Sequence, residues 1–131
     1  MIPRLRKEEH GQALVEMALV LPLFLLLLFG VIEMGRIGHA YISVSNAAGA
    51  GGRMASIEGT NSEIITSVKN AAASLNIVDN MITITPPEDQ RFSGGGVTVQ
   101  VTYPVQLIIP IISNVIPNPV IVCSKVIMRL E

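Results

Sequence analysis

Side chains that could perform chemistry are few in this sequence and lie far apart. His10 and His39 flank a long apolar run, so we expect them at opposite ends of one helix, where they cannot meet. Cys123 is the only cysteine, which excludes an intrachain disulfide. It falls within a strand-like stretch, and we interpret it as a packed, inert residue rather than a nucleophile. The sequence therefore predicts no enzyme: no catalytic residue, no metal site and no cofactor.

The most informative pair of residues is Gly11 and Glu16. Gly11 follows a charged leader, and a residue without a Cβ allows another molecule to approach the backbone closely. Glu16 lies five residues later, inside an apolar stretch where a carboxylate is costly unless it is paired. A charged residue within an apolar helix therefore indicates a functional role for Glu16. The alternative is that Glu16 merely extends toward lipid headgroups and that Gly11 is incidental.

The element that must position this pair is a hydrophobic helix. From Ala13 to Ile32, twenty residues carry a single charge, that of Glu16. At 1.5 Å per residue such a helix is about 30 Å long, which matches the hydrocarbon core of a bilayer. A helix in the core of a soluble domain would show a polar face, and residues 17–32 show none. The pattern predicts a membrane-spanning helix.

Basic residues before the helix predict its orientation. Arg4, Arg6 and Lys7 precede the apolar run, and an excess of such residues stays on the cytoplasmic side. We therefore expect a cytoplasmic N-terminus and a C-terminal domain beyond the membrane. A cleaved signal peptide is the alternative, but its small-x-small site at residues 38–40 lies eight residues beyond Ile32, which is unusually far.

The string HGQALVEMALVLPLFLLLLFGVIEMGR, residues 10–36, closely resembles the N-terminus of the TadE-like family. These proteins are minor pseudopilins of the tight-adherence (Flp) type IV pilus system. The shared features are Gly11, the run ALVEMALVLP at 13–22 and the run FGVIEMGR at 29–36. The chain departs from the family at Met17, where an aromatic residue is usual. It also carries Gly49, Gly51 and Gly52, which weaken a helix.

The resemblance implies a processing site and an assembly contact. A prepilin peptidase would cut between Gly11 and Gln12 on the cytoplasmic side and leave the hydrophobic helix attached. The new amine of Gln12 would be a cation, and Glu16 of a neighbouring subunit would be its natural partner, which would set the register of assembly. The resemblance further implies other pilins or pseudopilins and a pilus assembly platform as partners.

The rest of the chain predicts a small α+β domain. Thr60 and Glu63 form a capping box before a helix that should end near Asn76. Alternating residues at 82–85, 97–103 and 120–130 predict a roughly three-stranded antiparallel sheet, on which this helix packs. We divide the chain into a cytoplasmic basic leader (1–11), a transmembrane helix (12–35), a helical stalk and linker (36–59) and an extracytoplasmic α+β domain (60–131).

Two segments of this domain leave alternatives open. Small residues recur every four positions from Ser43 to Ala55, and this stripe packs either against another subunit or against the chain's own sheet. The segment 104–119 is uncharged and rich in proline and aliphatic residues. It could be buried, lie on the membrane or dock a partner, and we expect contact with the membrane or a partner. The residues expected to make this contact are Leu107, Ile108, Ile109, Ile111, Ile112, Val115 and Ile116.

Two classes of function remain after these observations. The net charge of −1 indicates no nucleic-acid partner. The favoured interpretation is a minor pseudopilin, inserted in the lipid bilayer of the cytoplasmic membrane and associated with a pilus or secretion apparatus. The alternative is an unprocessed, single-pass accessory or binding module of a membrane complex.

Overall fold

A computed structural model describes residues 3–131, with side chains described from Glu9 onward. Of the predicted basic leader, residues 1–2 and the side chains of Arg4, Arg6 and Lys7 lie outside the described part. The chain divides into two compact units, Met1–Met34 and Gly35–Glu131. We call the first the anchor unit and the second the globular unit.

A single helix, α1 (Pro3–Ser56), runs through the anchor unit and into the globular unit. From Ala13 to Ile32 its apolar side chains are exposed. Among the described residues it is the one helix long and apolar enough to cross a membrane. An apolar surface on every side of a helix requires lipid or other helices around it. The anchor unit is therefore compatible with a single-pass membrane anchor.

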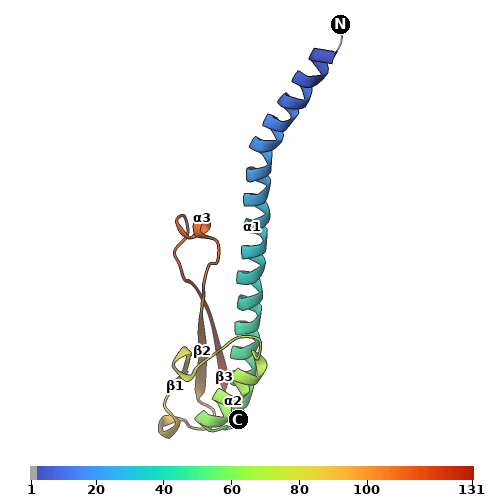
Figure 1. Ribbon diagram of the computed structural model, residues 1–131. Coiled ribbons are helices and arrows are strands. Elements are labelled where there is room, and N and C mark those ends of the chain that lie inside the picture. The colour runs from blue at the N-terminus through green and yellow to red at the C-terminus, as the bar shows by residue number, and fades with distance from the viewer. Residues whose placement is uncertain (1–2) are drawn as a thin grey trace. The chain divides into compact units, whose positions relative to one another are not determined.

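The globular unit is an α+β structure, as the sequence predicts. It holds the C-terminal part of α1, the helices α2 (Asn61–Ala71) and α3 (Pro110–Ser113), and the strands β1 (Ile82–Thr85), β2 (Gly96–Val105) and β3 (Val120–Arg129). Two single 3₁₀ turns, η1 (Asp79–Met81) and η2 (Glu88–Gln90), flank β1. The strands form an antiparallel sheet in the order β1-β2-β3. Figure 1 shows β2 and β3 as a long hairpin with α3 at its tip.

The capping box predicted for α2 is present. Thr60 Oγ1 accepts from the N–H of Glu63 at 3.3 Å, and the Glu63 carboxylate accepts from the N–H of Thr60 at 2.8 Å. The helix ends at Ala71, so the predicted end near Asn76 is wrong. Ala72 leaves the helical conformation with φ −120° and ψ 45°, because the chain turns there toward η1 and β1. Leu75 then packs on the core from this turn.

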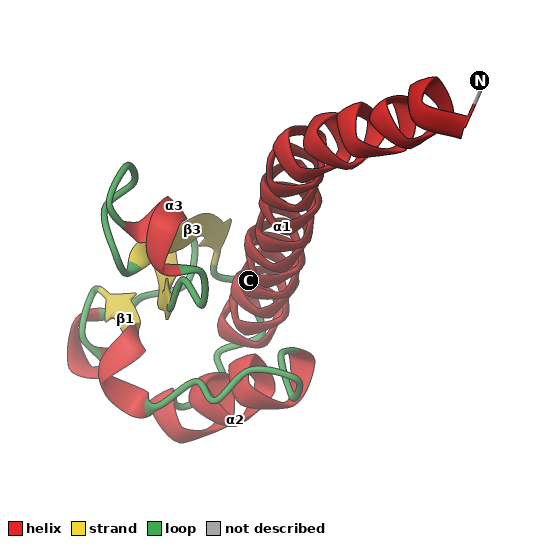
Figure 2. Cartoon of the chain, turned by 45° about the horizontal axis from the view of Figure 1, so that its top comes forward, coloured by secondary structure: helices red, strands yellow, loops and turns green. Residues whose placement is uncertain are grey.

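The core lies between one face of the sheet and the two helices. Val97, Val99 and Val101 of β2 are fully buried, and Val44 and the small residues of α1 cover them together with α2. Figure 2 shows α2 beside the C-terminal turns of α1, where Ser67 Oγ donates to the carbonyl oxygen of Ala50 at 3.3 Å. This part of α1 is therefore not a freely exposed stalk, because one of its faces is buried in the globular unit.

The glycines near the end of α1 lie inside a continuous helix. A Cβ at Gly51 would lie 2.6 Å from Cγ2 of Val68 and 3.0 Å from Cγ1 of Val99. A Cβ at Gly52 would lie 3.0 Å from side-chain atoms of β3. The small-residue stripe thus seats against the chain's own α2 and sheet, the second of the two alternatives that the sequence left open.

Cys123 lies on the outer face of the sheet and is exposed, so the prediction of a packed cysteine is wrong. Side chains alternate between the two faces of a strand. Val122 is buried, and its neighbour Cys123 must then face outward. The hydroxyl of Thr102, its cross-strand partner, donates to Sγ at 3.7 Å.

Candidate functional site

The predicted processing site lies on an exposed stretch of α1. Gly11 and Gln12 are helical and exposed, and apart from the adjoining residues and backbone of the same helix no described atom lies within 4 Å of the position that a Cβ of Gly11 would take. The peptide bond between them is not covered by other described parts of the anchor unit. A protease that binds this segment would have to unwind a turn of helix, and glycine lowers the cost of that step.

Glu16 stands one helical turn after Gln12 on the same face. The side-chain amide Nε2 of Gln12 donates to Oε1 of Glu16 at 3.2 Å. Glu16 is the only charged residue between Gln12 and Ile32, and it is exposed. Its carboxylate therefore projects from an otherwise apolar helix surface. In lipid such a group favours a cationic partner, because an unpaired charge there is costly.

The second predicted site is the hairpin loop, which we define as residues 106–119 between β2 and β3. Leu107 is only 7% exposed and packs inside the globular unit, so it does not face outward. Ile109 and Ile112 are half-buried. The exposed members of the predicted set are Ile108, Ile111, Val115 and Ile116. The loop thus presents about half of the aliphatic residues that the sequence singled out.

The root of the hairpin loop contacts the beginning of the globular unit. Nη2 of Arg36 donates to the carbonyl oxygen of Gln106 at 3.1 Å. Ala40, Val105 and Val122 form a small buried cluster there, separate from the main core. The side chains at this end of the hairpin therefore pack against the first turns of α1 that follow Gly35.

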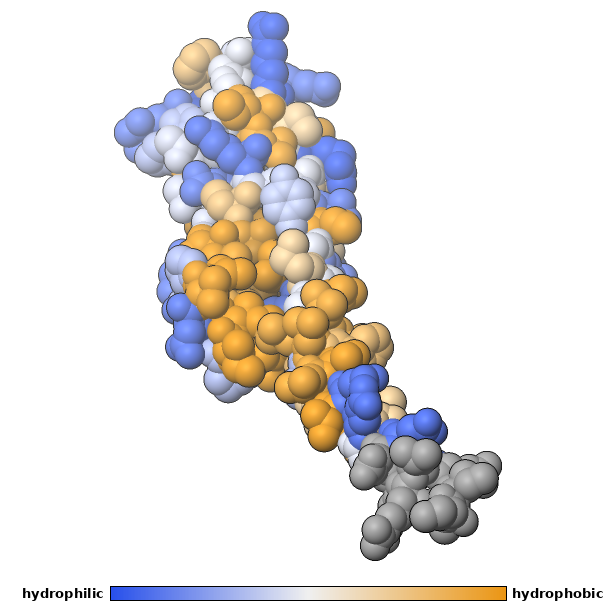
Figure 3. Space-filling view, turned by 90° about the horizontal axis from the view of Figure 1, so that it is seen from above, coloured by the Kyte–Doolittle hydropathy of each residue, from blue (hydrophilic) through white to orange (hydrophobic). Residues whose placement is uncertain are grey.

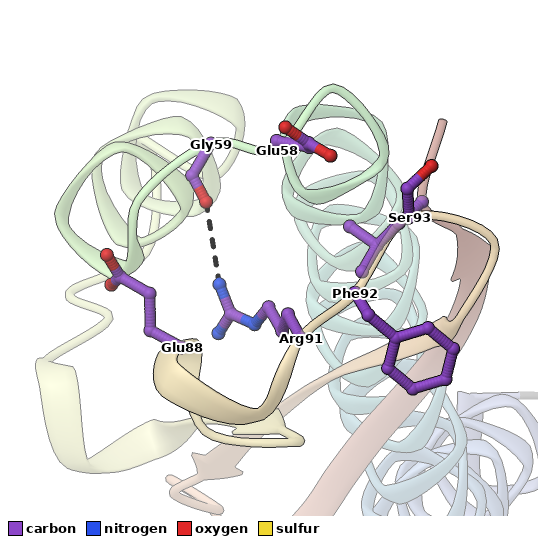
Figure 4. A pocket seen from close by; sticks show the side chains of 7 residues that line it. Glu58, Gly59, Glu88, Arg91, Phe92 and Ser93 are labelled. Atoms are coloured by element: carbon purple, nitrogen blue, oxygen red, sulfur yellow. Dashed lines mark hydrogen bonds between the residues drawn. The ribbon is translucent and has the colours of Figure 1, made fainter.

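A polar pocket of about 230 Å³ lies at the other end of the hairpin (Figure 4). It is lined by Glu58, Gly59, Glu88, Arg91, Phe92, Ser93 and Leu130. The guanidinium of Arg91 donates to the carbonyl oxygens of Pro86 (3.2 Å) and Gly59 (3.5 Å) and to Oδ1 of Asn61. These acceptors satisfy the arginine, so we interpret it as a structural tie between two turns.

The sequence reasoning missed this role of Arg91. Two of its three partners, Asn61 and Gly59, lie 30 and 32 residues away along the chain, and no local pattern points to them. Among residues 9–131, whose side chains are described, no three His, Cys, Asp or Glu side chains gather into a set that could hold a metal ion.

The helix that holds Gly11 and Glu16 also matches a known family. Residues 11–53 match the family model described as TadE-like protein. The resemblance inferred from the sequence is confirmed over this segment. No curated protein and no solved structure matches the chain. The TadE-like segment begins at Gly11 and ends within the last turn of α1, so α2, the sheet and the hairpin loop lie outside it.

Proposed function

We propose that this chain is a membrane-anchored minor pseudopilin, a structural component of a tight-adherence type pilus or a related secretion apparatus. The observation that carries the proposal is the TadE-like match, which starts at Gly11 and covers the exposed apolar stretch 13–32, where Glu16 is the single charge. The role is structural: subunits associate through their helices, and no substrate is turned over.

In this proposal the chain is inserted in the cytoplasmic membrane with its N-terminus in the cytoplasm. A prepilin peptidase cuts between Gly11 and Gln12 and leaves the helix in the bilayer. The new α-amine of Gln12 is cationic at neutral pH, since such amines have a pKa near 8. It pairs with Glu16 of a neighbouring pilin or pseudopilin and aligns the two helices at the assembly platform.

The geometry of the anchor unit supports this pairing. Gln12 and Glu16 share one helix face, separated by one turn. A neighbouring helix that is shifted along its axis by about one turn, roughly 5 Å, would bring its own Glu16 level with this Gln12. The exposed apolar side chains around Glu16 leave room for a second helix to pack beside it.

The first experiment determines the N-terminus of the protein purified from its own membrane, by intact mass and peptide sequencing. We expect the mature chain to start at Gln12. Gly11→Val should abolish cleavage, because a branched Cβ blocks close approach to the backbone. Gly38→Val is the matched control: Gly38 is also helical and exposed, and this variant should be processed normally. A start at Met1 in cells with an active peptidase would contradict the proposal.

A second experiment tests the role of Glu16. We expect Glu16→Val to be cleaved and inserted normally but to be lost from pulled-down pilus complexes, because the charge that pairs with the Gln12 amine is gone. Met17→Val is the control: it changes the neighbouring exposed side chain without changing charge, and it should assemble like the unmodified chain. Equal assembly of the two variants would rule out the register contact.

The exposed residues of the hairpin loop support one alternative function. An unprocessed, single-pass accessory module of a membrane complex could use Ile111 and Val115 to bind its partner. In that case the purified protein would retain residues 1–11, and Glu16→Val would leave its complex intact.

A further inference from the structure

The tip of the hairpin loop is exposed, uncharged and largely apolar, with Ser113 and Asn114 as its polar side chains. Ile111, Val115 and Ile116 are 63%, 83% and 40% exposed. The whole segment from Pro104 to Pro119 contains no charged residue. Figure 3 shows the molecule from above, and apolar side chains, including those of the anchor unit, cover much of the face in view. Such a surface is unfavourable in water unless something covers it.

The backbone of the tip is suited to an apolar environment. Polar groups that enter lipid must be hydrogen-bonded within the protein. The N–H groups of Ile112, Val115 and Ile116 donate to carbonyl oxygens within the tip at 3.0–3.1 Å. The hydroxyl of Ser113 donates to the carbonyl oxygen of Pro110 at 2.7 Å.

Other features of the loop also lower its demand for water. The prolines at 110, 117 and 119 have no N–H to satisfy. At the root of the loop, the side chain of Asn118 accepts from the N–H of Leu107 at 3.0 Å. The loop therefore meets much of its own hydrogen-bonding need without water.

The place of the tip within the globular unit is the basis for inferring what covers it. The strand β2 runs antiparallel to α1: Val99 lies near Gly51, whereas Val105 packs with Ala40. The hairpin loop consequently leaves the sheet at the end of the globular unit where the chain enters it, at Gly35. The apolar run ends at Ile32, and three helical residues span only about 4.5 Å. Figure 1 shows α3 beyond the ends of β2 and β3.

We propose that the tip of the hairpin loop, centred on Ile111 and Val115, inserts into the outer leaflet of the same bilayer that holds the anchor. The loop acts as a second membrane contact for the globular unit. Arg36, at the root of the loop, then lies at the level of the headgroups, where a cationic side chain is favourable. This inference rests on the membrane anchoring within the proposed function, and not on processing or pilus assembly.

The test uses the full chain in phosphatidylcholine vesicles. Cys123→Ser removes the only cysteine, and Val115→Cys or Ile111→Cys then carries an environment-sensitive fluorophore. We expect quenchers attached to lipid acyl chains to reduce its emission several-fold more than they do for the control, while iodide in the water has little effect. The matched control is the same fluorophore at Asp89→Cys, an exposed residue of η2 beside β1. It should respond to iodide alone.

Three outcomes would overturn the inference. Iodide could quench the tip as strongly as the control, which would leave the loop in water. Protection could disappear when the vesicles are diluted with excess lipid, which would identify a second copy of the chain as the occupant. Protection could also require phosphatidylglycerol, which would make the contact electrostatic rather than apolar.

A separate measurement distinguishes failure of this inference from failure of the proposed function. Retention of the chain in vesicles after an alkaline wash reports the anchor alone. If the chain stays in the vesicles but its tip is exposed to water, the loop contact is wrong and the membrane anchor is supported. Loss of the chain from the vesicles overturns both. The vesicles contain no peptidase or platform, so the result is independent of cleavage after Gly11.

Discussion

Gly51 lies where α1 approaches α2 and the sheet within van der Waals distance. The side chains that a Cβ would meet, Val68 and Val99, are fully buried and stiff at χ1. Gly51→Ala should gain about 1 kcal/mol of helix propensity. It should also lose about 1–3 kcal/mol through overpacking, so we expect no net gain and up to about 2 kcal/mol of lost stability.

Gly38→Ala provides the matched comparison at the same scale. Gly38 is exposed in the same helix, and a Cβ there meets no described atom within 4 Å. This variant should gain up to about 1 kcal/mol of stability. Unfolding of the full chain in detergent, followed by circular dichroism, compares the two. Stabilisation by both substitutions would mean that the core relaxes around Gly51 and that close packing does not require the glycine.

At the scale of elements, the turn between α1 and α2 and the loop after β1 are held together by Arg91. Its guanidinium binds the carbonyl oxygens of Gly59 and Pro86 and the side chain of Asn61. The carboxylate of Glu88 adds a contact to the N–H of Asn61 at 2.9 Å. The tie therefore joins two turns that lie about 30 residues apart in the chain.

Arg91→Met should loosen both turns while keeping most of the side-chain volume. A hydrogen bond contributes about 0.5–1.5 kcal/mol, so the loss of three, one of them long, predicts about 1–3 kcal/mol. Hydrogen exchange of residues 57–63 should accelerate. Arg53→Met is the control, since Arg53 is exposed on α1, and a surface change of this kind stays within about 0.5 kcal/mol. Unchanged exchange in Arg91→Met would show that the turns hold without the arginine.

At the scale of the whole molecule, the exposed Cys123 provides a reporter of orientation. It is the only cysteine, and it belongs to the globular unit. If that unit lies outside the cytoplasm, a membrane-impermeant maleimide should label right-side-out membrane vesicles without permeabilisation. Inverted vesicles should be labelled only after detergent is added. The opposite pattern would place the globular unit in the cytoplasm, and Cys123→Ser should abolish labelling in either case.

The amino-acid sequence by itself determined the long apolar helix and most of the local structure. A bilayer imposes a length and a polarity on any segment that crosses it, so twenty apolar residues with one carboxylate predict the helix without other information. The capping box of α2 and the alternation of β2 and β3 are likewise local, because they depend on residues two to four positions apart. The same alternation, read more strictly from Val122, would have placed Cys123 on the outer face.

Only the tertiary structure decided what the small residues of α1 face, how Arg91 is used and where the hairpin loop points. Each of these depends on contacts between residues far apart in the chain: Gly51 with Val99, Arg91 with Gly59, and Arg36 with Gln106. A stripe of small residues allows another element to approach the helix closely, but it does not indicate which element that is. Because α1 packs antiparallel to β2, the small residues face the chain's own sheet. The same packing places the uncharged hairpin loop at the end of the globular unit that contains Arg36.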